Sequence, residues 1–391
     1  MQAGLVLLCL AYVLSQFFRA FLAVLTAVLE RDLGAGPEQL ADASGFWFLS
    51  FALMQLPVGW LLDRVGPRRT AASLLLLGGG GGAAVFALAS APAHISIAMF
   101  LIGIGCSPVL MASYYIFARE YPPARFATLA ALMLGMGSVG NLVASYPTAL
   151  AVESIGWRGA LWVLSGASAL VALGILVTVR DPARHEAGGG GSVWTLLKLP
   201  VMWTILPMMF VCYAPSGAVR GLWIGPYLRD VFGQDTGQIG TATLIMGCAM
   251  IAGTLCFGPL DRIFKTRKWV IFAGNLGGAL AMLALVALID TSVTLSIAII
   301  AVAGFMGGTF APMIAHGRAF VPPHLVGRGV TLMNLFGIGG VGLMQFASGR
   351  MHAAWADPAL PTAPYTAIFT FFGLALLAGT LIYLFSKDSL D

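Results

Sequence analysis

The feature that most constrains this chain is a succession of apolar segments, each about 20 residues long, that recurs from one end to the other. A helix rises ~1.5 Å per residue, so a segment of this length spans the ~30 Å hydrocarbon core of a bilayer. Only 9% of the residues are charged, against roughly a quarter in soluble domains. The sequence therefore predicts an all-α integral membrane protein, and the short alternating segments of a transmembrane barrel are not found in it.

Charged residues, prolines and glycines divide the apolar sequence into twelve predicted membrane spans. They are expected at residues 4–29, 42–62, 70–90, 94–118, 126–151, 157–179, 200–228, 237–260, 269–289, 292–321, 328–350 and 362–385. The longest polar connection, 179–200, has a Gly-rich middle that is typical of a flexible linker. It separates an N-terminal six-helix bundle (1–180) and a C-terminal six-helix bundle (200–391) by a cytoplasmic linker (181–199).

The basic residues predict how the spans are oriented. One alternating set of connections holds most of the 21 lysines and arginines, whereas the opposite set holds only Arg31, Arg158, Arg229 and Arg350. By the positive-inside rule both termini are cytoplasmic, and we expect a multi-pass protein of a bacterial plasma (inner) membrane. The net charge of +5 resides in these inner loops and indicates the lipid bilayer, not a nucleic acid, as the partner.

The two halves of the chain repeat each other. The stretch LLDRVGPRR is echoed by PLDRIFKTRK, which aligns Asp63 and Arg64 with Asp261 and Arg262, and GMGSVG returns as GIGGVG. Parallel repeats of six spans are typical of transporters whose binding site lies between two lobes near the bilayer midplane.

The stretch GWLLDRVGPRRT, residues 59–70, resembles the loop motif between the second and third helices of the major facilitator superfamily. Together with the twelve spans and the repeat, this resemblance covers essentially the whole chain. It implies two pseudo-symmetric six-helix bundles that rock about a central cavity, so that the cavity opens alternately to each side.

The same resemblance implies a latch on the inner side. Asp63 would face the positive N-terminal end of a helix in the opposite lobe, the one that starts near Gly327, and Asp261 is its counterpart in the second copy. Basic residues would pair with carboxylates or carbonyls when the inner side is closed; they are Arg64, Arg68, Arg69 and Arg262. For Arg68 and Arg69 a role in membrane topology alone is an equal alternative.

Two arginines lie deep within predicted spans, Arg19 in the first and Arg220 in the seventh. Both end a Tyr-x-x-Ser-x-x-x-Arg pattern, and on a helix these positions share one face. The side chains of the two faces are Tyr12, Ser15, Gln16, Tyr213, Ser216, Trp223 and Tyr227. An arginine at this depth costs ~2.5–3.5 kcal/mol on insertion scales, so it needs water or a partner.

No acidic residue maps inside a span with these arginines, since all 16 fall in loops or at span ends. Each guanidinium could therefore hold a carboxylate, sulfonate or phosphate in a bidentate manner. We expect a small organic anion as the substrate, clamped by Arg19 and Arg220 from opposite lobes. Structural arginines paired with carbonyl groups are the alternative. Matched arginines on the first and seventh helices resemble the organic-phosphate antiporters of the superfamily and their organic-anion relatives.

Further polar or aromatic side chains could reach the cavity, namely Asn141, Asn334 and Trp47. His316 is the only histidine within a span; a neutral, hydrogen-bonded histidine is the default interpretation, and a proton carrier is the alternative. The five cysteines lack metal-ligand spacing, and no nucleotide or catalytic motif occurs, so we expect no cofactor and no enzymatic activity.

The mechanism predicted is secondary active transport by a monomer, coupled to protons or to a counter-transported anion, with facilitated diffusion as the remaining alternative. A drug exporter is one alternative, but binding cationic drugs would require acidic side chains in the cavity, and the sequence has none within its spans. A non-transporting anion receptor is another alternative. It would require a cytoplasmic signalling domain, whereas only SKDSLD follows the last predicted span.

Overall fold

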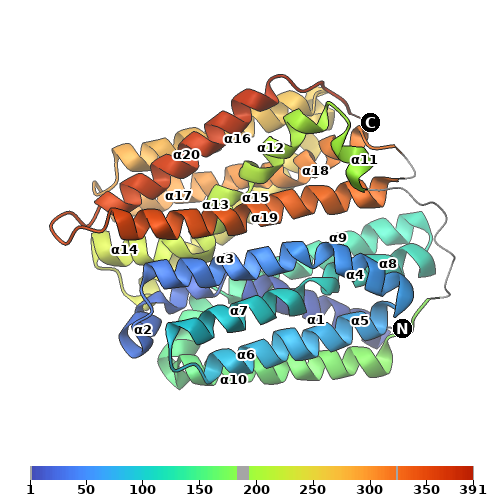
Figure 1. The fold of residues 1–391 in the computed structure, drawn as a ribbon, viewed down its shortest axis with the longest axis horizontal. Helices are drawn as coiled ribbons and strands as arrows, with labels where there is room; N and C mark the ends of the chain where they lie inside the picture. The colour runs from blue at the N-terminus through green and yellow to red at the C-terminus, as the bar shows by residue number, and fades with distance from the viewer. Residues whose placement is uncertain (1, 183–192, 323–324, 391) are drawn as a thin grey trace. The chain divides into compact units, whose positions relative to one another are not determined.

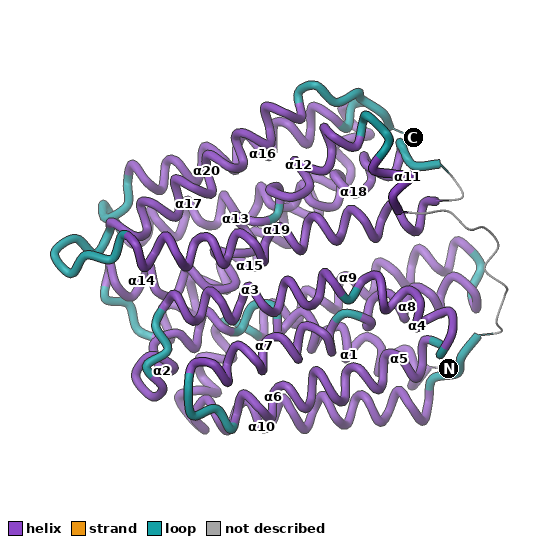
Figure 2. The backbone as a smooth tube through the Cα atoms, viewed as in Figure 1, coloured by secondary structure: helices purple, strands orange, loops and turns teal. Residues whose placement is uncertain are grey.

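The structure is a computed structural model that describes residues 2–182, 193–322 and 325–390. Every regular element in this part of the chain is a helix, as Figure 2 shows. The chain divides into two compact units, Met1–Gly188 and Gly189–Asp391. The all-α class is confirmed, while most of the predicted linker lies outside the described residues.

The N-terminal unit contains the helices α1 to α10 (Figure 1). Their bounds are α1 Gln2–Phe18, α2 Leu22–Leu33, α3 Pro37–Leu53, α4 Gln55–Arg64, α5 Pro67–Leu74, the π-helical η1 Leu75–Gly80, α6 Gly81–Ala87, α7 Pro92–Cys106, α8 Pro108–Glu120, α9 Pro123–Val143 and α10 Tyr146–Thr178. Several begin at a proline, which is tolerated there because the first turn needs no intrahelical N–H donor. Helix α1 packs against α9 and α10, and α3 packs against α7.

The C-terminal unit contains α11 to α20. Their bounds are α11 Val193–Leu197, α12 Met202–Cys212, α13 Ala214–Ala218, the π-helical η2 Val219–Trp223, α14 Ile224–Phe232, α15 Thr236–Phe264, α16 Lys268–Ala287, α17 Val293–Met306, the 3₁₀ turn η3 Gly307–Thr309, α18 Phe310–Ala319, α19 Val326–Ala354 and α20 Ala363–Tyr383. Helix α12 packs against α19 and α20, α15 against α17, and α16 against α20.

Nine helical segments of the described chain are long and apolar enough to cross a membrane, or eleven if each bent pair is one span. The bent pairs are α1 with α2, at 53°, and α3 with α4, at 42°. With the shorter apolar helix in α9, these segments account for the twelve predicted spans. The predicted span 126–151 is wrong in detail: α9 ends at Val143, the helix resumes at Tyr146, and the chain turns at Gly156, where φ is 71°.

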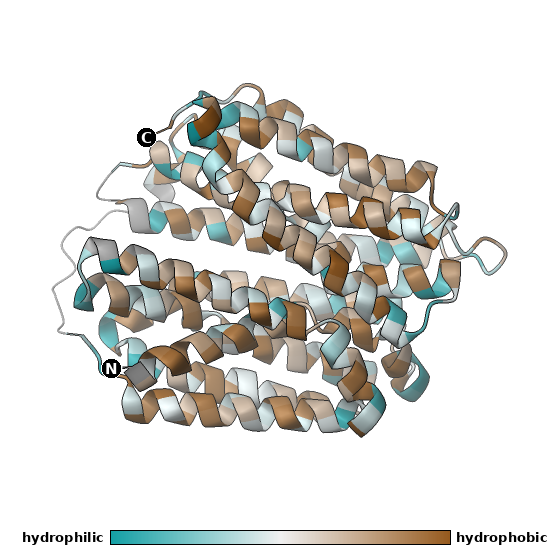
Figure 3. Ribbon diagram, turned by 180° about the vertical axis from the view of Figure 1, so that it is seen from behind, coloured by the Kyte–Doolittle hydropathy of each residue, from teal (hydrophilic) through white to brown (hydrophobic). Residues whose placement is uncertain are grey.

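Large apolar residues are exposed along many helices, and Figure 3 shows hydrophobic residues, in brown, distributed along the ribbon of both units. Val177 is 82% exposed and Leu170 is 73% exposed, both on α10. Side chains of this kind would form unfavourable patches in water, but in lipid they are the expected surface.

The repeated glycine segments explain how the first and fifth spans of each unit approach. A Cβ on Gly140 of α9 would lie 2.1 Å from the carbonyl oxygen of Val13, and one on Gly340 of α19 would lie 2.0 Å from that of Phe210. Since no side chain fits at such distances, both helix pairs need glycine at the crossing. GMGSVG and GIGGVG are thus both packing segments, with the crossing glycine at the sixth position of the first and at the fourth of the second.

Candidate functional site

Arg19 lies at a break in the first span, between the end of α1 at Phe18 and the start of α2 at Leu22. Its guanidinium carbon is 5.4 Å from the ring centroid of Trp47 and 5.6 Å from that of Phe51, both on α3. At this range a cation is attracted to the face of an aromatic ring, by ~2 kcal/mol or more where water is excluded. Trp47 was expected near the cavity, whereas Phe51 was missed because one aromatic residue among many in a span gives no signal.

Three polar side chains are hydrogen-bonded in series, centred on Gln16, three residues before Arg19 in the sequence. Gln16 donates from Nε2 to the Tyr12 hydroxyl at 2.6 Å, and Asn141 of α9 donates from Nδ2 to Gln16 Oε1 at 3.5 Å. The Ser15 hydroxyl points instead toward the carbonyl of Cys106, at 3.5 Å. Hydrogen bonds therefore connect three of the predicted residues, Tyr12, Gln16 and Asn141, whereas the Ser15 side chain faces α7.

Gly137 makes room for the hydrogen-bonded side chains of Tyr12 and Gln16. A Cβ on Gly137 of α9 would lie 2.3 Å from the Tyr12 ring and 3.1 Å from the Gln16 side chain. Gly137 belongs to the repeated GMGSVG segment, which the sequence identified as a repeat without revealing its contact with the tyrosine.

Arg220 lies in the π-helical stretch η2, between α13 and α14, and is 4% exposed. Single π-helical turns inside α-helices occur frequently at functional sites. The guanidinium packs over Gly247 of α15, where a Cβ would come within 2.9 Å of Nη2. The two arginines predicted from the sequence thus both lie where the helix of their span is irregular, which the apolar pattern alone did not indicate.

Tyr213 and Ser216 lie at a second break in the seventh span, where α12 gives way to α13. Pro215 cannot donate a backbone N–H, which favours an interruption at this point. The Tyr213 ring packs on Phe310 with centroids 4.9 Å apart, and the Ser216 hydroxyl donates to the Tyr213 carbonyl at 3.2 Å.

Trp223 and Tyr227 are fully buried and hydrogen-bonded within the C-terminal unit. The Trp223 indole donates to Gln345 Oε1 and Ser348 Oγ, each at 2.9 Å. The Tyr227 hydroxyl donates to the carbonyl of Ile289 at 2.6 Å. These contacts give both residues a packing role within the C-terminal unit, and their contact with the substrate stays a prediction. Asn334 is half-buried on α19.

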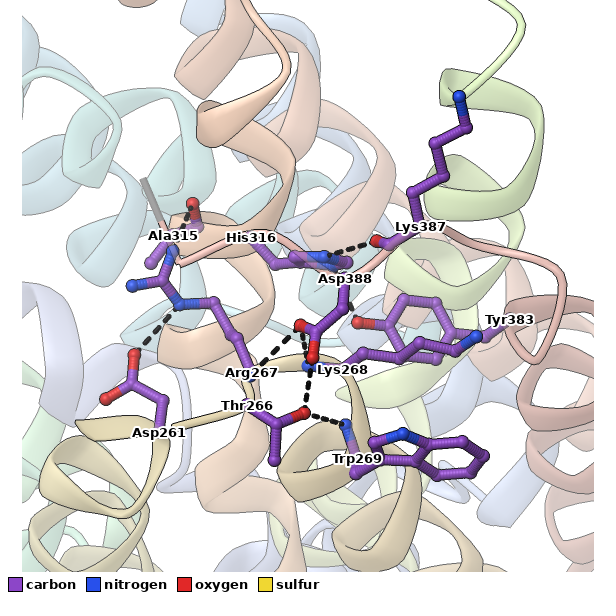
Figure 4. A network of polar contacts seen from close by, with 10 residues as sticks. All are labelled: Asp261, Thr266, Arg267, Lys268, Trp269, Ala315, His316, Tyr383, Lys387 and Asp388. Carbon is purple, nitrogen blue, oxygen red and sulfur yellow. Dashed lines mark hydrogen bonds and ion pairs between the residues drawn. The ribbon is translucent and has the colours of Figure 1, made fainter. Parts of the chain in front are cut away.

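His316 of α18 is fully buried, and both of its ring nitrogens have partners (Figure 4). Its Nε2 lies 3.0 Å from the carbonyl oxygen of Lys387, which can only accept, so Nε2 carries the proton. Its Nδ1 lies 2.6 Å from the Tyr383 hydroxyl and accepts from it. A neutral histidine satisfies this geometry on both sides, which supports the default interpretation over the proton carrier.

The residues of the loop motif lie at the end of α4, in the first turn of α5 and at the end of α15. Asp63, Arg64 and Arg69 are exposed, while Asp261 is 6% exposed and pairs with Arg267 at 2.9 Å. Arg262 is exposed as well.

Chemically, the described residues offer cationic, amide and hydroxyl groups at mid-span. Their acidic side chains lie in connections, within the first or last two turns of helices or beside the turn at Gly156. Over the described ranges, no group of three or more His, Cys, Asp or Glu side chains could hold a metal ion. This composition suits an anion and disfavours a cation.

Comparison with known proteins gives a consistent assignment. The family model described as Major Facilitator Superfamily matches residues 8–220. The probable sulfoacetate transporter SauU of Cupriavidus necator is 24% identical over 305 residues, which are 71% of this chain and 70% of that protein. The probable galactarate/D-glucarate transporter GudP of Bacillus subtilis is 23% identical over 288 residues, 65% of this chain and 63% of that protein.

Solved structures share the fold. A D-xylose-proton symporter aligns with a TM-score of 0.79 at 17% identity and covers 98% of both chains. A bacterial homologue of the human lysosomal transporter Spinster, inward-facing and occupied, aligns with a TM-score of 0.75 at 19% identity and covers 97% of this chain and 95% of its own. The predicted arrangement of twelve helices in two halves is confirmed by these matches.

Proposed function

Since the chain belongs to the major facilitator superfamily and is a membrane transporter, not an enzyme, we propose that its substrate is a small organic anion bound by Arg19 and Arg220. The observation that carries the proposal is the matched setting of the two residues. Each ends a Tyr-x-x-Ser-x-x-x-Arg pattern, and each lies where the helix of its span is interrupted or π-helical. Discontinuous helices are a recurrent feature of transporter binding sites.

The geometry of each arginine supports an anion. A guanidinium presents a planar fork of donors that matches a carboxylate or sulfonate, and in a poorly hydrated site each charge-assisted hydrogen bond is stronger than a neutral one. Tyr12, Gln16 and Asn141 would add donors in the N-terminal unit, and Tyr213 and Ser216 in the C-terminal unit. Acidic groups near the ends of the helices leave the middle of the spans favourable to negative charge.

The relatives point to anions with two acidic groups. Sulfoacetate carries a sulfonate and a carboxylate, and galactarate and glucarate are dicarboxylates. Two arginines, one from each half of the chain, would suit such a substrate, because binding both ends would draw the halves together. This favours a dianion over a drug-like cation, and membership in a transporter family disfavours a receptor without transport.

We further propose that the protein works as a monomer in a bacterial inner membrane with both termini in the cytoplasm, as the loop charges predict. Coupling by exchange or by protons on the substrate fits the acid-poor spans. Because His316 is already bonded on both sides, we do not assign it the proton.

The test measures ligand-induced thermal shifts of purified protein with sulfoacetate, glucarate, a quaternary ammonium ion and a neutral sugar. We expect stabilisation by the anions, and stabilisation by the cation alone would overturn the proposal. Replacing Arg19 or Arg220 with Gln should weaken anion binding by roughly 10- to 150-fold, as expected for lost charged hydrogen bonds. Lys should rescue poorly because it lacks the fork. Arg31→Gln is the matched control, since Arg31 is exposed and pairs with Asp32 at 2.8 Å.

A further inference from the structure

The last residues of the chain bind back onto the connection between α15 and α16 (Figure 4). The Asp388 carboxylate accepts hydrogen bonds from the Thr266 hydroxyl and from the backbone N–H groups of Arg267, at 3.2 Å, and Lys268, at 2.9 Å. The Lys268 ammonium group donates in turn to the carbonyl of Leu384, at 2.6 Å. Since α16 begins at Lys268, Asp388 closes the N-terminal end of that helix from outside.

The N-terminal unit contains the same arrangement. Asp181 follows α10, the last helix of its unit, as Asp388 follows α20. It accepts from the backbone N–H of Arg68 at 2.8 Å and lies 3.5 Å from the guanidinium Nε of the same residue. Arg68 is in the first turn of α5, which begins at Pro67. In each unit, therefore, an aspartate beyond the last helix caps the helix that begins within the loop motif.

The α4–α5 and α15–α16 connections also each contain a residue with positive φ just before the capped helix. Gly66 has a φ of 101°, and Lys265 has a φ of 52°, the one positive φ of a non-glycine residue over the described ranges. A Cβ on Gly66 would lie 2.9 Å from the Asp181 carboxylate, so glycine also makes room for the cap. A lysine in this conformation needs support from its surroundings, which the bonds from Asp388 to the next three residues supply.

We propose that Asp181 and Asp388 are paired positioning residues, each of which fixes the second half of its loop motif, where the next helix begins, and so holds an arginine there in place. In the C-terminal unit the arginine is Arg267. Its backbone is held by Asp388, while its Nε donates to Asp261 at 2.9 Å and its Nη1 to the carbonyl of Ala315 in α18 at 3.4 Å. In the N-terminal unit it is Arg68, held at both backbone and side chain.

The consequence is mechanical and goes beyond substrate binding. The tail, the α15–α16 connection and α18 are joined through Asp388, Arg267 and the His316–Lys387 contact, so they move as one body. A change in this body should alter how fast the transporter changes conformation. It should leave substrate affinity alone, because none of these residues belongs to the proposed binding set.

The first test is hydrogen exchange on the full-length protein, and it requires no substrate. Asp388→Ala should speed exchange at the Arg267 and Lys268 amides on the order of 10-fold, the loss expected for hydrogen bonds to a charged group, and Asp181→Ala should do the same at Arg68. Asp357→Ala is the control, since Asp357 accepts only locally, from the Ala359 N–H at 2.9 Å. Unchanged exchange at the capped amides would overturn the proposal. If an alanine variant does not fold, the asparagine variant, which keeps one acceptor oxygen, is used instead.

The second test separates positioning from general support. If Asp388 holds Arg267 for Asp261, the shifts in melting temperature of Asp388→Ala and Asp261→Ala should not add, although the two carboxylates are not bonded to each other. Additive shifts would overturn the role of Asp388 as a positioning residue.

A third measurement rests on the proposed anion transport and uses sulfoacetate uptake by vesicles. Asp388→Ala should lower the maximal rate several-fold with KM unchanged, whereas a raised KM at an unchanged rate would overturn the inference. If sulfoacetate is not transported by the wild type, the proposed function fails while the exchange and melting results still stand.

Discussion

Replacing Gly247 with Ala tests the proposed role of Arg220 without touching the arginine itself. A Cβ at this position would lie 2.9 Å from Nη2 and 3.3 Å from Nε of Arg220, whereas ordinary contact begins at 3.4 Å. The nearest atom is the far end of a flexible side chain, so the guanidinium can yield while the helices stay in place. The variant should therefore fold and carry a displaced arginine.

The size of the effect follows from the displacement. The guanidinium must move by at least the difference between 2.9 and 3.4 Å. A displaced guanidinium loses at least part of a charge-assisted hydrogen bond, which is worth ~1.5–3 kcal/mol, so roughly a tenfold loss of anion affinity is expected here. That corresponds to ~1.4 kcal/mol.

The assay is titration of sulfoacetate against purified protein, followed by thermal shift. Gly258→Ala is the matched control, because it lies on the same helix α15 and its Cβ would meet nothing within 4 Å. Both variants gain the same helix propensity, up to ~1 kcal/mol, so a difference between them reports on Arg220. If Gly247→Ala binds the anion as tightly as Gly258→Ala, Arg220 does not contact the substrate and the reasoning is refuted.

Four other predictions concern single residues. Trp223→Phe removes an indole donor from two buried acceptors and should lower stability by ~1–3 kcal/mol in chemical unfolding, while a large loss of anion affinity would show that Trp223 contacts the substrate. His316→Asn should lower the melting temperature but leave the pH profile of uptake unchanged; a shifted profile would show that His316 carries protons. Gly105→Ala places a Cβ 2.1 Å from the Gly79 nitrogen and should prevent stable folding, whereas Gly59→Ala, with open space around it, should not. Burial raises the pKa of Asp388, but the hydrogen bonds from Thr266 and the two amides outweigh it, so the pKa lies below the ordinary 3.8. The contribution of Asp388 to folding stability is therefore complete above pH 3.8 and is lost as the pH falls through the lower folded-state pKa. This acid-dependent loss should be missing from the melting profile of Asp388→Asn.

The apolar pattern was sufficient to predict the fold. In a bilayer every span must satisfy its own backbone hydrogen bonds, so runs of about 20 apolar residues leave little alternative to helices. The errors lie at boundaries and breaks, as in the fifth span, where a short turn at residues 144–145 interrupts a continuous hydrophobic run. Hydropathy averages over such interruptions and cannot locate them.

The candidate site was predicted in part. The repeat identified Arg19 and Arg220, and the structure joins Tyr12, Gln16 and Asn141. Trp223 and Tyr227 share the arginine-bearing pattern yet turn into the packing of their own unit, because their polar groups find acceptors there. A helical face read from sequence cannot tell a cavity from a neighbouring helix.

The sequence by itself determined the membrane class, the twofold repeat and the two arginines within spans, because burial in lipid makes each charge and each apolar run conspicuous. Only the tertiary structure decided what those residues touch. The break at Arg19, the π-helical turn at Arg220 and the aspartates that cap α5 and α16 depend on contacts between residues far apart in the chain. Such contacts have no local pattern, since they are set by the packing of whole helices.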